Sequence, residues 1–479
     1  MARSCVLALD QGGHASRALL FDAEGKVLAH AERRIATHRS GTARVEHTAA
    51  AVLRSLREAA EAAIEDLPRG YTIEAAGLAT QRSSIACWDR GSGKPLSPVI
   101  SWQDRRAARQ VASLAPEARR VTELTGLVLS PHYGASKLAW CLRHLAVVKK
   151  ARREGSLAAG PLASFAVAGL TQGHPCLADP VNGARTQLLD IGRGDWSEEL
   201  CHLFGVPREI LPQPVPNRHD FGGLEVVGRT IPLTVVIGDQ PAALFADGAP
   251  NDHTAYLNLG TGAFVQCLSA RAVPGLLRSV LWRDSGRTLF ALEGTVNGAA
   301  TALDAVAKQL GLNKVRVPRA LPAWLDAPDE PPLFLNGIGG LGAPYWRAGF
   351  RSRFLGRGDA GQKMAAAAES IVFLLLENLD RMRAAGTELR TLRVTGGLAQ
   401  LDGLCQRLAD LSALSVERPF LYEATAMGLA RLLGGATQAA PAKFIRFEPR
   451  SAPALEARRR RWQAAMQEAL QERQKKRPG

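Results

Sequence analysis

CVLALDQGGHASRALLFDAEGKVLAHAE, residues 5–32, is the stretch that decides the fold. It holds three short apolar runs, and turns that contain glycine separate them. Apolar runs bounded by such turns are typical of strands. The stretch therefore predicts an antiparallel meander with strands at 5–10, 18–22 and 27–32.

The residues that follow extend this pattern. Apolar side chains recur at Val52, Leu56 and Ile64, on one face of a predicted helix over 48–67. A fourth strand is predicted at 75–80. Three strands, a helix and a strand in this order are typical of the ribonuclease-H-like unit that actin-type ATPases use.

A related order returns in the second half of the chain. Strands are predicted at 255–259 and 263–268, with GTG between them, and a helix is predicted at 297–310. LALDQGG (7–13) in the first half corresponds to YLNLGTG (256–262) in the second. The sequence therefore predicts an α/β fold of two ribonuclease-H-like (actin-like ATPase) domains with a cleft between them.

The repeated pattern also divides the chain near Asp239. We expect an N-terminal domain at 1–240, a C-terminal domain at 241–450 and a basic tail at 451–479. The tail is rich in arginine and predicts a solvated helix with a frayed end. Residues 146–160 are rich in charged and small side chains and are expected to form a surface loop. Residues 312–332 are rich in proline and alanine and are expected to form an inserted loop near the cleft.

The bulk numbers restrict the class of protein. The 479 residues carry a net charge of +15, but the arginines are spread along the chain without a nucleic-acid-binding motif, so no nucleic acid is expected. There is no apolar run of about 20 residues, which predicts no membrane span. The N-terminus lacks a signal-peptide layout. The seven cysteines are scattered without a CxxC pair, and this favours a reducing cytoplasm.

The sequence VVIGDQPAAL, residues 235–244, places an acid at a defined point of the predicted fold. An apolar run leads to Gly238 and Asp239, and Pro241 suits the first turn of a helix. Asp239 is therefore expected at the end of a strand and beside a helix N-terminus, with its carboxylate facing the cleft. We interpret it as the general base of a kinase that acts on a small molecule.

Glycine turns between strands predict phosphate binding, because such turns present backbone N–H groups to an anion. The first half has Gly12 and Gly13 after the strand that ends at Asp10, and the second half has 260–262. Asp10 could hold Mg²⁺, which prefers one or two carboxylates together with phosphate oxygens. Arg17 is close enough in sequence to reach the same phosphates.

A third glycine turn, Gly396–Gly397, follows a predicted strand at 392–395 and precedes a predicted helix at 401–413. A backbone without side chains could approach a flat adenine ring there. None of the three turns matches GxGxxG or the P-loop, so those nucleotide folds are not supported. Taken singly, each turn is more readily a plain turn, and it is their order along the chain that indicates phosphoryl transfer.

Taken together, these segments are similar to the FGGY family of carbohydrate kinases, and most similar to its glycerol kinase branch. The similar segments run in family order from residue 7 to about 435. They are LALDQGGHASRALLFD (7–22), QRSSIACWDRGSGKPLSPVISWQDRRA (81–107), TGLVLSPHYGASKLAWCLRH (125–144), GDQPAALFADG (238–248), LNLGTGAFV (257–265), GLGAPYW (340–346) and RVTGGLAQLDGLCQRLADL (393–411).

The resemblance implies a sugar or polyol site mainly in the N-terminal domain and an ATP site mainly in the C-terminal one. By position, Asp239 matches the general base and Asp10 matches the carboxylate associated with Mg²⁺. The nucleotide-binding positions of the family fall at Gly12, Gly13, His14, Arg17, Gly260, Thr261, Gly262, Gly396 and Gly397. The positions that contact the polyol fall at Arg82, Ser83, Trp102, His132, Asp239 and Gln240.

The chain departs from the family pattern at several of these positions. Ser83 stands where glycerol kinases carry a glutamate that bonds substrate hydroxyls, and His132 stands where they carry a tyrosine. Gly13 and His14 replace the usual threonines of the first phosphate turn. A site that loses such an acceptor discriminates its hydroxyls less well, so we expect a somewhat larger polyol or a ketose rather than glycerol.

The sequence as a whole predicts an ATP-dependent, Mg²⁺-assisted kinase that phosphorylates a hydroxyl of a small sugar or polyol in the cytoplasm. Two alternatives stay open. One is a catalytically weakened relative that acts as a ligand-binding sensor. The other is an actin-like ATPase that drives a protein partner, which the combination of Arg82, Trp102 and Gln240 disfavours. A homo-oligomer also stays open.

Overall fold

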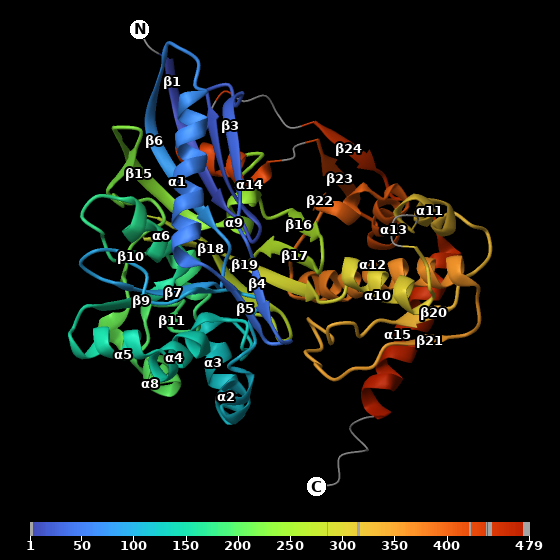
Figure 1. The fold of residues 1–479 in the computed structure, drawn as a ribbon. Helices are drawn as coiled ribbons and strands as arrows, with labels where there is room; N and C mark the ends of the chain where they lie inside the picture. Colours follow the sequence, from blue (N-terminus) through green and yellow to red (C-terminus); the bar gives the residue numbers. More distant parts are fainter. Residues whose placement is uncertain are drawn as a thin grey trace. The chain divides into compact units, whose positions relative to one another are not determined.

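The computed structural model describes residues 3–284, 286–313, 317–420, 423–436, 438 and 443–472 (Figure 1). Within it the chain forms two compact units. The first comprises Met1–Pro250, Ser279–Phe290 and Leu421–Pro441, and the second comprises Asn251–Arg278, Ala291–Phe420 and Ala442–Gly479. Each unit therefore draws on both halves of the sequence, while the domain limits at 240 and 450 stay predictions.

A six-stranded sheet forms the centre of the first unit, in the order β14-β15-β6-β1-β2-β3. The strands are β1 (Arg3–Gln11), β2 (Ala15–Phe21), β3 (Val27–Arg34), β6 (Tyr71–Thr80), β14 (Gly223–Val226) and β15 (Arg229–Gly238). The predicted meander is confirmed, because β1 pairs with β2 and β2 with β3, both antiparallel. β6 joins β1 in parallel, and β15 joins β6 in parallel. These three parallel strands end near one edge of the sheet.

Helix α1 (Ala49–Glu65) buries the predicted apolar face, which includes Val52 and Leu56, in the same core as the sheet. A second sheet has the order β4-β5-β8-β7-β9. Its strands are β4 (His38–Ser40), β5 (Arg44–His47), β7 (Ile85–Asp89), β8 (Val99–Ile100) and β9 (Leu157–Pro161). Two small strand pairs are β10 (Leu177–Ala178) with β13 (Gln213–Pro214), and β11 (Leu189–Asp190) with β12 (Asp195–Trp196).

The other helices of the first unit are short, and several of them carry residues of the predicted site or lie next to them. They are α2 (Ala108–Ser113), α3 (Ala118–Thr125), α4 (Gly134–His144), α5 (Ala146–Arg153), α6 (Leu162–Leu170), α7 (Pro180–Ala184), α8 (Glu198–Phe204), α9 (Asp239–Leu244) and α14 (Ala424–Leu432). Short 3-10 turns are η1 (Ala115–Glu117) and η2 (Arg208–Ile210).

The second unit contains most of a seven-stranded sheet in the order β18-β19-β17-β16-β22-β23-β24. The strands are β16 (Thr254–Leu259), β17 (Ala263–Leu268), β18 (Leu277–Asp284), β19 (Arg287–Val296), β22 (Thr391–Thr395), β23 (Ser415–Pro419) and β24 (Phe444–Phe447). Its helices are α10 (Ala300–Gln309), α11 (Val317–Leu325), α12 (Ala360–Ala384), α13 (Asp402–Ser412) and α15 (Pro453–Glu472), with η3 (Gly397–Gln400) and the pair β20 (Leu333–Leu335) and β21 (Arg353–Leu355). Both units therefore combine sheets with helices, which confirms the predicted α/β class.

Two segments predicted as loops contain regular structure. Residues 146–160 contain α5 and most of β9, and α5 turns only Val148 and Ala151 into the core. Two apolar contacts in eight residues are too sparse a pattern to indicate a helix from sequence. Residues 312–332 contain α11, which buries Leu321 and Leu325 despite an internal proline.

The expected solvated tail is also wrong as far as the structure describes it. The side chain of Trp462 is fully buried, packs against Phe373 of α12 and donates its ring N–H to the Phe334 carbonyl oxygen at 2.9 Å. Arg458 is 5% exposed and bonds Glu369 through Nη2 at 2.6 Å. One face of α15 therefore packs against the rest of the second unit, although its composition is rich in arginine. Residues 473–479 lie outside the described part of the chain.

Candidate active site

Asp239 is the first residue of α9 and directly follows β15. The arrangement is the one predicted, a strand that leads into a helix with an acid at the junction. Glycine is required at position 238 for a steric reason, because a Cβ there would lie 2.6 Å from Cγ of Arg82. The aliphatic part of Arg82 therefore crosses the backbone immediately before Asp239.

The carboxyl group of Asp239 is half-buried and accepts a hydrogen bond from the Gln240 backbone N–H at 2.7 Å. Burial raises the pKa of Asp239, and the nearby charges of Arg82 and Arg185 oppose that rise. The Asp239 carbonyl oxygen accepts a bond from the Thr425 hydroxyl of α14 at 3.4 Å. Both the carboxyl group and the backbone carbonyl group of Asp239 are thereby held in place.

Asp10 lies near the end of β1 and is only 6% exposed. The sheet register puts it opposite Arg17, whose Nη1 is 3.7 Å from Asp10 Oδ2 and whose Nε is 2.8 Å from Glu32 Oε2. Burial raises the pKa of Asp10 to about 7, and the charge of Asp239 adds to the rise. The two predicted carboxylates therefore influence one another inside one unit.

The predicted polyol residues of the first unit also come together. Arg82 donates a hydrogen bond from Nη2 to Oε1 of Gln240. The rings of Trp102 and His132 are 5.6 Å apart between centroids. Ser83 is linked to His132 through a buried lysine, which donates to both backbone carbonyl oxygens.

That lysine, Lys137, was not among the sequence-predicted site residues. Its Nζ lies 3.0 Å from the Ser83 carbonyl oxygen and 2.6 Å from the His132 carbonyl oxygen, and its side chain is fully buried. Arg105 was missed as well, and its Nη2 lies 3.5 Å from His132 Nδ1. Both stand in the similar segments quoted above, but only the fold shows that their side chains turn toward His132.

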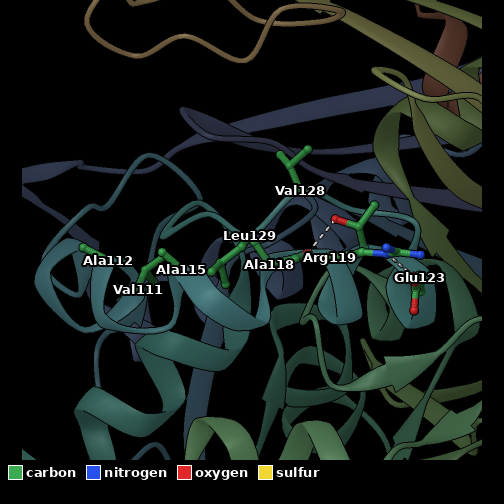
Figure 2. Close-up of a pocket in the computed structure, with 9 residues that line it drawn as sticks. Val111, Ala112, Ala115, Ala118, Arg119, Glu123, Val128 and Leu129 are labelled. Carbon is green, nitrogen blue, oxygen red and sulfur yellow. Dashed lines mark hydrogen bonds and ion pairs between the residues drawn. The ribbon is translucent and has the colours of Figure 1, made fainter. Parts of the chain in front are cut away.

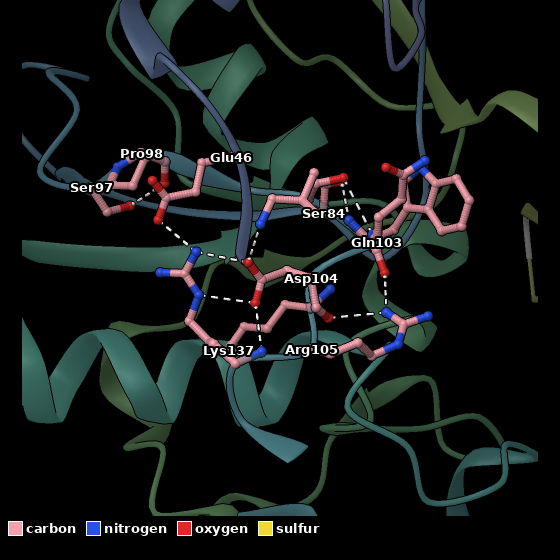
Figure 3. Close-up of polar contacts among 12 residues, drawn as sticks. Glu46, Ser84, Ser97, Pro98, Gln103, Asp104, Arg105 and Lys137 are labelled. Atoms are coloured by element: carbon pink, nitrogen blue, oxygen red, sulfur yellow. Dashed lines mark hydrogen bonds and ion pairs between the residues drawn. The ribbon is translucent and has the colours of Figure 1, made fainter. Parts of the chain in front are cut away.

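A buried carboxylate, Asp104, organises the loop that carries Trp102 and Arg105 (Figure 3). It accepts the Val45 backbone N–H at 2.7 Å and two bonds from Arg106, at 2.9 and 2.7 Å. Arg106 also pairs with Glu46 at 2.6 Å. The loop is therefore fixed by charge-assisted bonds, which are about twice as strong as neutral ones.

The first glycine turn is held by its carbonyl oxygens. The Gly12 N–H closes the turn onto the Ala15 carbonyl oxygen at 2.9 Å. The carbonyl oxygens of Gly12, Gly13 and His14 then accept bonds from neighbouring residues. The donors are Gln11 Nε2 (2.6 Å), Thr37 Oγ1 (3.4 Å) and the Ile35 N–H (2.8 Å), respectively.

The second unit brings its two predicted glycine turns together. The carbonyl oxygens of Gly260 and Thr261 accept bonds from the backbone of residues 299–301, at the start of α10, at 3.1 and 3.2 Å. Gly396 has a φ of 92°, and a Cβ there would lie 2.6 Å from the carbonyl oxygen of Leu259, directly before Gly260. Gly397 has open space around its Cα. Glycine is thus required at 396 by close backbone contact.

One cavity lies elsewhere in the first unit (Figure 2). It measures about 550 Å³ and is lined mostly by apolar side chains of α2, η1 and α3, with an ion pair between Arg119 and Glu123 at 2.8 Å. None of the predicted site residues lines it. Since it gathers few polar groups, it does not suit the chemistry expected of the chain.

Two negative findings complete the geometry. Among the described residues, no cluster of three or more histidine, cysteine or carboxylate side chains could hold a metal ion on its own. Likewise, the described helices include none with the length and apolarity that a membrane crossing needs.

Comparisons with known proteins identify the family of the chain. Residues 5–246 match the N-terminal domain of the FGGY family of carbohydrate kinases, and residues 255–437 match its C-terminal domain. A glycerol kinase of Rhodospirillum centenum is 35% identical over 446 residues, which cover 90% of this chain and 89% of that protein.

Solved structures show the same fold. Plasmodium falciparum glycerol kinase, crystallised with ADP, superposes with a TM-score of 0.88 at 22% identity and 98% coverage of both chains. Xylulose kinase from Rhodospirillum rubrum superposes with a TM-score of 0.84 at 18% identity, covering 96% of this chain and 98% of that one. The two-domain, actin-like ATPase fold predicted from the sequence is thereby confirmed.

The comparisons also separate the functional alternatives left open by the sequence. The matching relatives and family domains are kinases, and nothing in the comparisons supports a ligand-binding sensor. The chain therefore belongs to the FGGY family of carbohydrate kinases, ATP-dependent phosphotransferases that act on an alcohol group of a sugar or polyol.

Proposed function

We propose that Asp239 is the general base of this kinase, and that the acceptor sugar or polyol binds in the first unit against Arg82, Ser83, Trp102, His132 and Gln240. One observation carries the proposal. The half-buried carboxyl group of Asp239 lies beside the hydrogen-bonded pair of Arg82 and Gln240 and within electrostatic reach of Asp10. A carboxylate so placed can accept the proton of an attacking hydroxyl.

The electrostatics of Asp239 suit that role. A general base works best when its pKa is near the working pH, since it must be ionised yet basic. Burial raises the pKa of Asp239, and Arg82 with Arg185 keeps the ionised form accessible. The Gln240 side chain, bonded to Arg82, would orient the substrate, while Trp102 and His132 would bound the sugar on another side.

Asp10 fits a magnesium ion. Mg²⁺ is commonly held by one or two carboxylates with waters and substrate phosphates rather than by a full protein cage. Asp10 is a single buried carboxylate whose pKa is raised mainly by burial, and Arg17 Nη1 lies 3.7 Å from its Oδ2. When bound, Mg²⁺ would supply positive charge to the phosphates. Ionised Asp10 would position it, and Arg17 would balance the remaining charge.

The glycine turns suit the polyphosphate and the nucleoside. In the first unit the carbonyl oxygens of Gly12, Gly13 and His14 are already bonded, so the turn is rigid before a ligand arrives. In the second unit the turn at 260–262 is bonded to the start of α10, and a Cβ added at Gly397 would meet no atom within 4 Å. We assign the N–H groups of the first two turns to phosphates and the Gly396–Gly397 turn to adenosine.

The test of the base is Asp239→Asn. Turnover measured as ADP release should fall about 10²–10⁴-fold, the usual contribution of a general base, while MgATP binding measured by calorimetry should persist. Asp252→Asn is the matched control, because Asp252 is exposed in the turn before β16. Full activity in Asp239→Asn would refute the assignment.

The acceptor is open to a direct screen. Ser83 and His132 differ from the glycerol kinase pattern, so a polyol or ketose larger than glycerol should be turned over faster than glycerol. ADP release across a panel of both classes measures this, and turnover of glycerol alone would contradict it. We also assign the protein to the cytoplasm, which the seven free cysteines favour.

A further inference from the structure

Asp179 is a buried carboxylate that the proposed mechanism does not use. It directly precedes α7 and is 1% exposed. Its side chain accepts the backbone N–H groups of Val181 and Asn182 at 3.1 and 3.0 Å. It also accepts the side-chain amides of Asn182 at 2.9 Å and of Asn217 at 3.3 Å. All of these donors are neutral N–H groups.

The residue type at position 179 exceeds what a helix cap requires. Burial raises the pKa of Asp179 to about 6, and the hydrogen bonds from Asn182 and Val181 oppose the rise. A buried charge is costly unless its surroundings compensate it. A neutral side chain is enough to cap a helix, as Ser197 does for α8. The carboxylate of Asp179 therefore needs a reason beyond the cap of α7.

Asn217 connects this carboxylate to the strand that leads to Asp239. Asn217 is fully buried, and its side-chain amide donates to the Val236 carbonyl oxygen at 2.7 Å as well as to Asp179. Its backbone carbonyl oxygen accepts the Val236 N–H at 3.0 Å, and its side-chain oxygen accepts the Arg283 N–H at 2.8 Å. One residue thus holds the peptide groups of Val236, which lies in the last part of β15.

Asn182 connects the same carboxylate to the end of β6. Its side-chain oxygen accepts the Thr80 hydroxyl at 3.4 Å. Thr80 is the last residue of β6, pairs with Gly238 in the sheet and precedes Arg82 by two positions. Val181 lies close to the same point, since a Cβ at Gly238 would be 3.2 Å from its Cγ1. The bonds of the carboxylate therefore reach the ends of both strands that lead into the proposed site.

The other end of α7 also bears on the base. Arg185 directly follows α7, is 5% exposed and lowers the pKa of Asp239 through its charge. Its Nη2 donates to the Ser279 hydroxyl at 2.9 Å. Because the bonds of Asp179 fix the start of α7, they also fix the backbone that leads to Arg185.

We propose that Asp179 is a positioning residue for phosphoryl transfer: through Asn182 and Asn217 its carboxylate fixes the ends of β6 and β15 and so sets where Asp239 stands. The inference rests on the proposed function, because it takes Asp239 as the base. A shift of a reacting group by about 1 Å can lower a rate about 10²-fold. Loss of the carboxylate should therefore lower kcat, while KM holds because no group that binds substrate is removed.

Asp179→Asn tests the assignment in the intact protein. The amide has nearly the same shape, but its nitrogen is a donor and faces other donors, so part of the network is lost. The acceptors are glycerol, xylitol and D-xylulose, and the one that the parent protein turns over fastest is used. We expect kcat, measured as ADP release, to fall about 10- to 100-fold, while KM for ATP and for the acceptor changes less than about threefold.

Asp190→Asn is the matched control. Asp190 also accepts two backbone N–H groups, those of Gly192 and Arg193 at 2.9 and 3.2 Å, but it belongs to the small β11–β12 pair. Its kcat should stay within about twofold of the parent, and circular dichroism shows whether each variant is folded. A parent-like kcat in Asp179→Asn, a rise in KM without a fall in kcat, or an equal fall in Asp190→Asn would overturn the inference.

A double-mutant cycle supplies a readout that general destabilisation would not produce. Asn217→Ala should itself lower kcat with KM held. Combined with Asp179→Asn it should lower kcat little further, because coupled residues are not additive. Losses that multiply would refute action through Asn217, and Asn182→Ala gives the same test for the β6 side if Asn217→Ala does not fold.

The outcomes separate this inference from the proposed function. An inactive Asp239→Asn together with a fully active Asp179→Asn would overturn the positioning role alone. Full activity in Asp239→Asn, or no turnover of any of the three acceptors by the parent protein, would count against the proposed function and would remove the positioning role with it.

Discussion

The two units each contain a hairpin whose turn carries glycines, yet the two hairpins differ in chemistry. Two residues before the glycine that closes each turn, β1 and β2 place Asp10 opposite Arg17, whereas β16 and β17 place Asn258 opposite Phe264. Asp10 is 6% exposed, and Asn258 is exposed. A buried carboxylate paired with a partly exposed arginine thus occupies one hairpin, and a neutral, exposed residue occupies the other.

The turns themselves are more alike than the residues before them. In both, the N–H of the first glycine closes the turn, at Gly12 and at Gly260, and the carbonyl oxygens that follow accept bonds from the surrounding chain. The same backbone arrangement thus occurs in each unit, where we propose that it binds phosphate. Of the two hairpins, the first carries the buried carboxylate, Asp10, that we propose for the metal ion.

The largest expected effect is a difference in activity between matched substitutions in the two hairpins. Asp10→Asn removes the carboxylate that we propose for Mg²⁺ and should lower kcat/KM about 10²–10⁴-fold, because a bound metal stabilises the transition state by several kcal/mol. Asn258→Asp, at the matching exposed point, should stay within about threefold of the parent. ADP release at saturating and limiting Mg²⁺ measures both. Comparable losses in the two variants would show that the hairpins do not differ as we propose.

Much of this comparison was predictable from the sequence. Apolar runs broken by glycine turns predicted the β1–β2 and β16–β17 hairpins, and the acid after the 235–237 run predicted the junction at Asp239. These signals are local, and strand and turn propensities act locally. The similar segments and their order along the chain predicted the family.

The rest could not be predicted, because it depends on contacts between distant residues. Lys137 has no local signal, and its role depends on Ser83, 54 positions away. The tail was misread because arginine usually indicates solvent, whereas Arg458 meets Glu369 inside the second unit. A single buried ion pair leaves no periodic pattern in the sequence. Composition therefore predicts an exposed position for charged residues that the structure buries.

A second prediction concerns stability against pH. The pKa of Asp10 is raised from 3.8 to about 7 in the folded chain. As the pH rises toward 7, the carboxyl group therefore ionises in the unfolded chain before it ionises in the folded one, and the free energy of unfolding falls. Asp10→Asn removes this effect. Without Mg²⁺, the gain in free energy of unfolding that Asp10→Asn gives at pH 8 should exceed the gain at pH 5 by on the order of 2–3 kcal/mol.

Urea denaturation at the two pH values measures this difference, and Asn258→Ala is the matched variant of the other hairpin. The change in free energy of unfolding for Asn258→Ala should be the same at pH 5 and pH 8, since no titratable group is removed. A pH-independent effect of Asp10→Asn would mean that its carboxyl group is not held near neutral pKa.

Glycines of the two units should also differ. Gly396 combines a φ of 92° with a Cβ position 2.6 Å from the Leu259 carbonyl oxygen, so Gly396→Ala should destabilise by about 1–3 kcal/mol. KM for ATP should rise with it, because the shift displaces the adjoining phosphate turn. Gly13→Ala meets no atom within 4 Å and should leave stability within about 0.5 kcal/mol. Thermal unfolding and ATP titration test both, and an equal loss for the two would contradict the steric argument.

The smallest expected effect concerns the support behind each turn. Thr301 donates its hydroxyl to the Thr261 carbonyl oxygen at 3.1 Å, but the backbone N–H groups of Ala299 and Thr301 bond the same oxygen, at 3.2 Å each. Thr301→Val therefore removes one of three donors and should cost about 0.5–1 kcal/mol, raising KM for ATP about two- to threefold. Thr37→Val, behind the first turn, loses a longer bond of 3.4 Å to Gly13 and should change KM less. A loss above about tenfold in Thr301→Val would mean that the side chain, rather than the backbone at the start of α10, sets the shape of the second turn.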